Sequence, residues 1–133
     1  MNRPVVCDAS FAVKWFKDEA GSGTAMGLLE DHACERLDIH MPEQCVAEVL
    51  SVCGRWEPAP ASIEAWVQLD MAGVVRHPLS DDLVRGAEAQ MGALGCGFYD
   101  ALAPALASML GAALYSADSR AHGGFPGAVI VDS

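Results

Sequence analysis

The chain of 133 residues is 52% hydrophobic, which excludes a disordered protein and fits one domain spanning residues 1–133. Its 18 acidic residues outnumber 8 scattered basic ones, for a net charge of −10. This charge excludes a protein that coats nucleic acid non-specifically, but it allows an enzyme whose bound cations supply the positive charge. No apolar run reaches the ~20 residues of a membrane span and the start lacks a signal peptide's apolar core, which predicts a cytoplasmic protein without a membrane partner.

The first half of the chain alternates short apolar strands with helices. Residues 4–7 predict a buried first strand, which Asp8 ends, and residues 38–41 predict a second. Pro42 stands where a helix tolerates proline, at its start. Helices are expected over residues 11–17, 43–56 and 62–71. A further helix is expected from a cap at Ser22 or Thr24 through about residue 31, with Met26 and Leu29 facing inward.

The second half continues the alternation. A third strand is expected at residues 74–75, a helix from about Ser80 to 93, and a last strand at 128–131. Residues 101–110 are almost all apolar and predict a helix buried nearly all round, with Gly111 as its C-terminal cap. Pro104 is expected in the first turn of this helix, where its missing N–H costs little. A strand over residues 112–115 follows.

Alternating helices and strands predict an α/β fold, with a parallel sheet of four to five strands covered by helices on both faces. Ligands of such sheets bind outside the carboxyl ends of the strands. Asp8 and Asp118 follow strand ends, Asp100 begins a helix, and Glu48 lies in a helix that follows a strand. We therefore expect these four acids to lie together in one cleft at the carboxyl ends of the strands.

Each acid also has a plainer interpretation, so only their joint pattern carries the hypothesis. Asp8 and Asp100 could cap helices, Asp118 could lie in a turn, and Glu48 could be a solvated surface acid. Carboxylate oxygen is the ligand that hard divalent cations prefer. Four carboxylates without a nearby His or Cys therefore favour Mg²⁺ or Mn²⁺ over Zn²⁺.

Four segments resemble the motifs of one family in the correct order. Residues 5–16 read VVCDASFAVKWF, which resembles the opening of PIN-domain ribonucleases, especially the VapC-type toxins of bacterial toxin–antitoxin pairs. The second, third and fourth motifs of that family resemble PEQCVAEVLSV at 42–52, YDAL at 99–102 and LYSAD at 114–118. The resemblance implies a PIN-like three-layer α/β/α domain that cleaves RNA endonucleolytically with Mg²⁺ or Mn²⁺. It also implies a homodimer and a small antitoxin protein that blocks the site.

The resemblance assigns the family's acids to Asp8, Glu48, Asp100 and Asp118. In this interpretation Asp8 and Asp100 are the main metal ligands, Asp118 binds directly or through water, and Glu48 orients the attacking water. The family's supporting hydroxyls correspond to Ser10 and Ser116, which would fix the carboxylate rotamers. Separately, Lys14 and Arg120 are candidates for contact with phosphate or for a solvated surface role.

Two other functions stay open. One is a catalytically inactive PIN-like module that binds a protein partner, and the other is an α/β phosphotransfer enzyme that would carry a phosphoryl group on Asp8. The five cysteines form no C-x-x-C pair, which favours reduced, mostly buried thiols over disulfides or a zinc site. The histidines share no spacing and are interpreted as surface or packing residues: His32, His40, His77 and His122.

Overall fold

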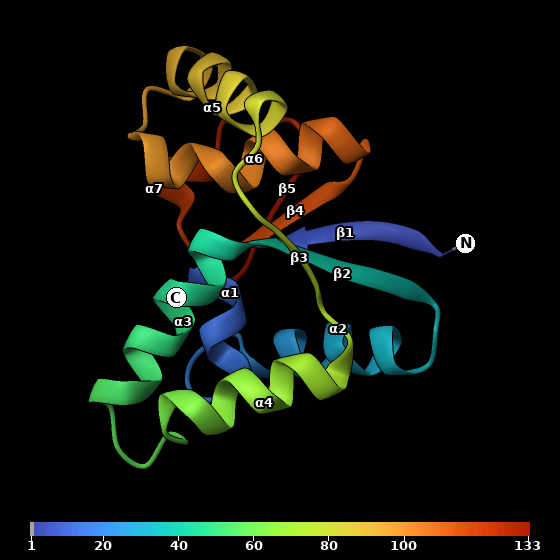
Figure 1. The fold of residues 1–133 in the computed structure, drawn as a ribbon, viewed down its shortest axis with the longest axis vertical. Helices are drawn as coiled ribbons and strands as arrows, with labels where there is room; N and C mark the ends of the chain where they lie inside the picture. Colours follow the sequence, from blue (N-terminus) through green and yellow to red (C-terminus); the bar gives the residue numbers. More distant parts are fainter. Residues whose placement is uncertain (1) are drawn as a thin grey trace.

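The computed structural model describes residues 2–133 and has a five-stranded sheet between two layers of helices (Figure 1). All strand pairs are parallel, and the strand order is β3-β2-β1-β4-β5. The strands are β1 (Arg3–Cys7), β2 (Leu37–Pro42), β3 (Val75–His77), β4 (Ala113–Ser116) and β5 (Ala128–Ile130). The expected α/β fold with a parallel sheet is therefore confirmed.

Helices cover both faces of the sheet, as Figure 1 shows. One layer consists of the helices that come after β1 and after β2 in the chain. They are α1 (Ala9–Ala12), the 3₁₀ turn η1 (Val13–Trp15), α2 (Ser22–Ala33), α3 (Glu43–Arg55) and α4 (Ser62–Ala72). The opposite layer consists of the helices that come after β3 and after β4 in the chain, which are α5 (Asp81–Leu94), α6 (Phe98–Leu110) and α7 (Ser119–His122). The chain changes layers where it leaves β3, because β4 pairs with β1 on the far side of β2.

The core lies between β1 and α6. Val5, Val6 and Cys7 have no exposed surface, and helix α6 packs across β1, β2 and β4. Leu102 and Leu106 of α6 are at most 1% exposed, and burying side chains of this size stabilises the fold by about 1.5–3 kcal/mol each. This burial is what fixes the start of α6 beside the end of β1.

Helix α6 confirms two expectations and corrects two others. Gly111 ends the helix with φ of 62°, the left-handed conformation that favours glycine. The burial is nearly complete from Ala101 to Ala107, but Met109 is 49% exposed, because the end of the helix passes beyond the sheet. Pro104 lies in the second turn and not in the first, because α6 begins at Phe98.

Two expectations in the first layer also need correction. The helix expected over residues 11–17 begins earlier, where Asp8 accepts a hydrogen bond from the Phe11 N–H, and it tightens into η1 after one turn. In α2 the buried apolar residues are Ala25 and Leu28; Leu29 packs partly buried against the core as expected, whereas Met26 is 49% exposed. The apolar stripe of α2 is weak, so the sequence pattern does not predict which face of this helix is buried.

All five cysteines are free thiols, and three of them are buried: Cys7, Cys45 and Cys53. Within residues 2–133, no single helix is long and apolar enough to cross a membrane. Helices α5 and α6 pass that test only when they are taken together, and they meet at an angle of 108°.

Candidate functional site

The four predicted acids line one small cleft, which we call the acid cleft. It has a volume of about 60 Å³ and is lined by Asp8, Ala9, Ser10, Cys45, Glu48, Tyr99, Asp100, Ala103, Asp118 and His122. The acids come from the end of β1, from α3, from the first turn of α6 and from the loop after β4. Strand order reverses between β1 and β4, and such a switch point is where open α/β sheets bind ligands.

Asp8 is the most constrained of the acids. It is only 4% exposed, and its Oδ1 accepts hydrogen bonds from the Phe11 N–H at 2.9 Å and from Ser10 Oγ at 2.8 Å. Its Oδ2 accepts a hydrogen bond from Ser116 Oγ at 2.7 Å. A buried carboxylate is costly unless several donors compensate its charge, and these donors do so while fixing its rotamer.

The two predicted hydroxyl residues join the ends of β1 and β4. Ser10 Oγ accepts a hydrogen bond from the Ala117 N–H at 2.9 Å, and Ser116 Oγ accepts one from the Asp118 N–H at 3.0 Å. The two hydroxyl oxygens lie 3.3 Å apart. Ser10 and Ser116 therefore hold the loop that carries Asp118 against Asp8.

The other three acids are more open than Asp8. Glu48 and Asp100 are exposed, and Asp118 is half-buried at the N-terminus of α7, where its Oδ1 accepts a hydrogen bond from the Ala121 N–H at 3.0 Å. Although the Glu48 side chain is exposed as a whole, partial loss of solvent around its carboxyl group in the cleft raises its pKa, and the negative charges of Asp100 and Asp8 raise it further. The cleft therefore concentrates negative charge, which a cation would relieve.

His122 is a cleft residue that the sequence interpretation placed outside the site. It is 3% exposed, its Nε2 donates to the Asp100 carbonyl at 2.6 Å, and its Nδ1 lies 3.0 Å from Asp8 Oδ2. Burial lowers its pKa, but the hydrogen bonds to Asp8 and to the Asp100 carbonyl outweigh burial, and the pKa of His122 is raised overall. The signal in the sequence was its position four residues after Asp118, one helical turn away.

The donor chemistry of the cleft fits Mg²⁺ or Mn²⁺. The expectation that no His or Cys lies near the acids is wrong, because Cys45 and His122 both line the cleft. Burial together with the charge of Asp8 raises the pKa of the Cys45 thiol, and both ring nitrogens of His122 already have partners. The available ligand atoms are therefore the carboxylate oxygens, which hard cations prefer. In the described part of the chain, no three His, Cys, Asp or Glu side chains are arranged to hold a metal ion as they stand.

The two candidates for phosphate contact lie outside the acid cleft lining. Lys14 is 3% exposed, and its ammonium donates to the Ala20 carbonyl and lies 3.6 Å from Glu19. Through these two contacts Lys14 holds the loop that precedes α2. Arg120 is exposed on α7. Contact of either residue with phosphate stays a prediction.

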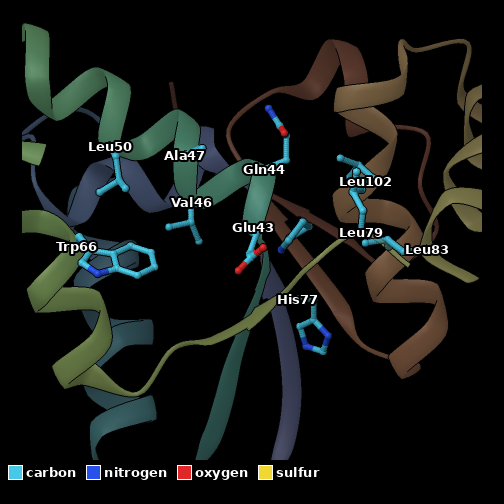
Figure 2. A pocket seen from close by; sticks show the side chains of 11 residues that line it. Glu43, Gln44, Val46, Ala47, Leu50, Trp66, His77, Leu79, Leu83 and Leu102 are labelled. Atoms are coloured by element: carbon cyan, nitrogen blue, oxygen red, sulfur yellow. The ribbon is translucent and has the colours of Figure 1, made fainter. Parts of the chain in front are cut away.

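A larger hollow, which we call the apolar groove, lies beside the acid cleft. Its volume is about 490 Å³, and Figure 2 shows Val46, Leu50 and Trp66 on one side of it and Leu79, Leu83 and Leu102 on the other. Helix α3 separates the two hollows, because Ala47 faces the groove while Glu48 lines the cleft. A ligand in the groove would therefore lie next to the acids.

Comparisons with known proteins give one family and several similar folds. The profile of the PIN domain family matches residues 5–123. The fold is similar to that of a toxin–antitoxin complex from Klebsiella pneumoniae, with a TM-score of 0.72 and 16% identity over 94% of this chain and 95% of the other. It is also similar to Mycobacterium tuberculosis VapC20, described as a toxin that cleaves the sarcin–ricin loop, with a TM-score of 0.70 and 19% identity over 91% and 95% of the chains.

A third similar structure is VapBC2 from Rickettsia felis bound to a DNA fragment of its promoter, with a TM-score of 0.69 and 14% identity over 98% of both chains. A comparison with curated proteins gave no significant match.

Proposed function

Because the chain belongs to the PIN domain family, we propose that it is an endoribonuclease that uses Mg²⁺ or Mn²⁺ to cleave phosphodiester bonds of RNA. The observation that carries this proposal is the acid cleft, where acids from four separate segments meet at the switch point of the sheet. A relative that had lost catalysis would have no need to keep four like charges together, since their repulsion destabilises the fold.

The residues of the cleft divide into ligands and supports. Asp8, Asp100 and Asp118 would hold the metal, and Glu48, with its raised pKa, would orient the attacking water. A bound divalent ion supplies charge stabilisation at the phosphoryl oxygens and a more acidic water. Ser10 and Ser116 hold the Asp8 carboxylate in one rotamer throughout.

We further propose that the protein is the toxin of a toxin–antitoxin pair, acts in the cytoplasm as a homodimer and is blocked by a small antitoxin. The similarity to toxin–antitoxin complexes supports a partner of this kind. The apolar groove offers a surface for such a partner, because it and the acid cleft are lined by neighbouring residues of α3, Ala47 and Glu48, so that a partner bound in the groove would lie close to the acids. A net charge of −10 favours a basic partner segment.

The test is cleavage of a structured RNA by purified protein in Mg²⁺ or Mn²⁺. The wild type should cleave and should stop when a chelator is added, and Asp100→Asn should abolish cleavage, because it removes a ligand charge with little change of shape. His77→Ala is the matched control, because His77 lines the groove and not the cleft, and it should keep full activity.

Three outcomes would contradict the proposal. Cleavage retained by Asp100→Asn would show that Asp100 is no ligand, and a large loss of cleavage in His77→Ala would place the reaction outside the acid cleft. A wild type that binds its partner but cuts no RNA in either metal would favour the inactive protein-binding module.

A further inference from the structure

Pro104 leaves the carbonyl of Asp100 without its usual donor. In an α-helix the N–H of each residue donates to the carbonyl four residues earlier. For Asp100 that residue is Pro104, which lies inside α6 and has no N–H. The missing bond falls in the first turn of α6, where this helix borders the acid cleft.

The ring of His122 occupies the place of the missing donor. A carbonyl oxygen can only accept, so the contact of 2.6 Å means that His122 Nε2 donates to Asp100. The other ring nitrogen lies 2.8 Å from Ser116 Oγ and 3.0 Å from Asp8 Oδ2. One buried ring therefore spans the distance between the start of α6 and the end of β1.

We propose that His122 is a positioning residue that replaces the donor removed by Pro104 and thereby sets the placement of Asp100 relative to Asp8. This inference rests on the proposed function in so far as these two acids act together. It links two features far apart in the sequence, a proline inside a helix and a histidine in the short helix α7. Pro104 is not part of the cleft lining, and both ring nitrogens of His122 already have partners in the protein, so the effect of these residues on catalysis runs through the two acids.

His32 shows what a purely structural histidine looks like in the same protein. It is also buried and also has a partner at each ring nitrogen, but both partners are backbone groups: its Nε2 donates to the Ala72 carbonyl at 2.7 Å, and its Nδ1 accepts from the Ile39 N–H at 3.0 Å. These partners join α4 to β2 and lie outside the acid cleft lining. His32 therefore serves as the matched control for loss of a buried, doubly bonded ring.

The experiment is a double-mutant cycle on the wild type, His122→Phe, Pro104→Ala and the double mutant. Mn²⁺ affinity is measured without RNA, from the electron paramagnetic resonance signal of the free ion. His122→Phe should weaken Mn²⁺ binding about 10- to 100-fold, as losing a residue that orients metal ligands does. In the Pro104→Ala background the same change should cost clearly less, because position 104 then has an N–H that can donate to the Asp100 carbonyl.

The same four proteins are also melted in chelator, which requires neither metal binding nor activity. His122→Phe should lower the melting temperature by less when Pro104 is replaced. Adding imidazole to His122→Ala should restore part of the Mn²⁺ affinity, and His122→Gln should fall between the wild type and His122→Phe. His32→Phe should lower the melting temperature without coupling to Pro104 and without weakening Mn²⁺ binding.

Equal losses in the two backgrounds, in both affinity and melting temperature, would overturn the proposal, as would unchanged Mn²⁺ affinity in His122→Phe. A loss of Mn²⁺ affinity in His32→Phe as large as that in His122→Phe would also overturn it. A wild type that binds Mn²⁺ but cuts no RNA would remove the proposed function and leave this inference standing, since the cycle does not use RNA.

Discussion

Two carboxylates of the acid cleft also stabilise the fold by capping helices. Asp8 caps α1 and Asp118 caps α7 through their side-chain oxygens, and both also line the acid cleft. Replacing either one therefore removes a cap, which typically costs ~1 kcal/mol, together with a candidate ligand. Asp100 is exposed in the first turn of α6 and caps nothing, so it is the acid whose replacement separates metal binding from folding.

Asp100→Asn should therefore be nearly neutral without metal. Removing its charge relieves repulsion with Glu48, but it forfeits a favourable interaction of ~0.3–1 kcal/mol with the N-terminal end of α6. Mn²⁺ at ~100 times its dissociation constant should stabilise the wild type by about 2.7 kcal/mol, on the order of 10 °C in melting temperature. Mn²⁺ should stabilise the mutant much less. The measurement is a thermal melt of each protein with chelator and with Mn²⁺. An equal gain in both proteins would mean that Asp100 does not bind the ion.

The sequence pointed to Asp8, Asp100 and Asp118 because each stands beside a strand end or a helix start, and to Glu48 because its helix follows a strand and resembles the family's second motif. The parallel sheet places the strand ends next to Asp8 and Asp118 on one edge, whereas the strand order and the packing of α3 and α6 bring Glu48 and Asp100 to them. His122 was missed because its part in the site depends on the Asp100 carbonyl, a backbone atom that no side-chain pattern reports. The absence of an N–H at Pro104 was visible in the sequence, but only the register of α6 shows which carbonyl it leaves without a donor.

At the scale of elements, β2 and β3 are joined by a pair of histidines as well as by their backbones. His40 Nδ1 and His77 Nε2 lie 2.8 Å apart, so one nitrogen must donate and the other accept. Burial lowers the pKa of both rings, and the charge of His77 lowers that of His40 further, against the opposite effect of Asp38. A doubly protonated pair cannot keep this hydrogen bond.

The pair should make the edge of the sheet sensitive to acid. Because the folded state lowers both pKa values, the stability from the pair is fully present above the unfolded value of ~6.5 and is lost as the pH falls through the lower folded values. The urea midpoint of the wild type should therefore fall more between pH 7 and pH 5 than that of His77→Ala. The raised pKa of His122 acts in the opposite sense, but both proteins share it. A steeper fall in His77→Ala would refute this account.

Segment periodicity predicted the type of nearly every element but not its ends. Helix α6 begins earlier than expected because Gly97 precedes it with extended backbone. Helix α7 was missed because its four residues are too short to show a helical period. The exposed side chains of α4, such as Ile63 at 69%, show that its apolar residues exceed what one buried face needs.

For the whole molecule, alternation of helices and strands predicted a parallel sheet, but strand order needed the structure. Nothing local in the sequence says that the chain crosses from β3 to the far side of β1. The apolar groove was also invisible, because it forms between helices α3 and α4 on one side and α5 and α6 on the other. Net charge is a property of the whole chain that needs no fold, and it supports a prediction of its own.

A charge of −10 repels a polyanion, so the protein should bind RNA weakly unless divalent ions bridge the two. Non-specific binding to nucleic acid usually has dissociation constants of ~10⁻⁴ to 10⁻⁶ M at physiological salt, and we expect this protein in chelator to lie at or beyond the weak end. Mg²⁺ should tighten binding, because ions in the acid cleft reverse the local charge. The measurement is fluorescence anisotropy of a labelled RNA hairpin at ~150 mM monovalent salt, in the cold before cleavage proceeds, with Mg²⁺ or with chelator. Asp100→Asn should show a smaller Mg²⁺ effect than the wild type. Sub-micromolar binding that is indifferent to Mg²⁺ would contradict the prediction and would indicate an RNA-binding surface away from the acids.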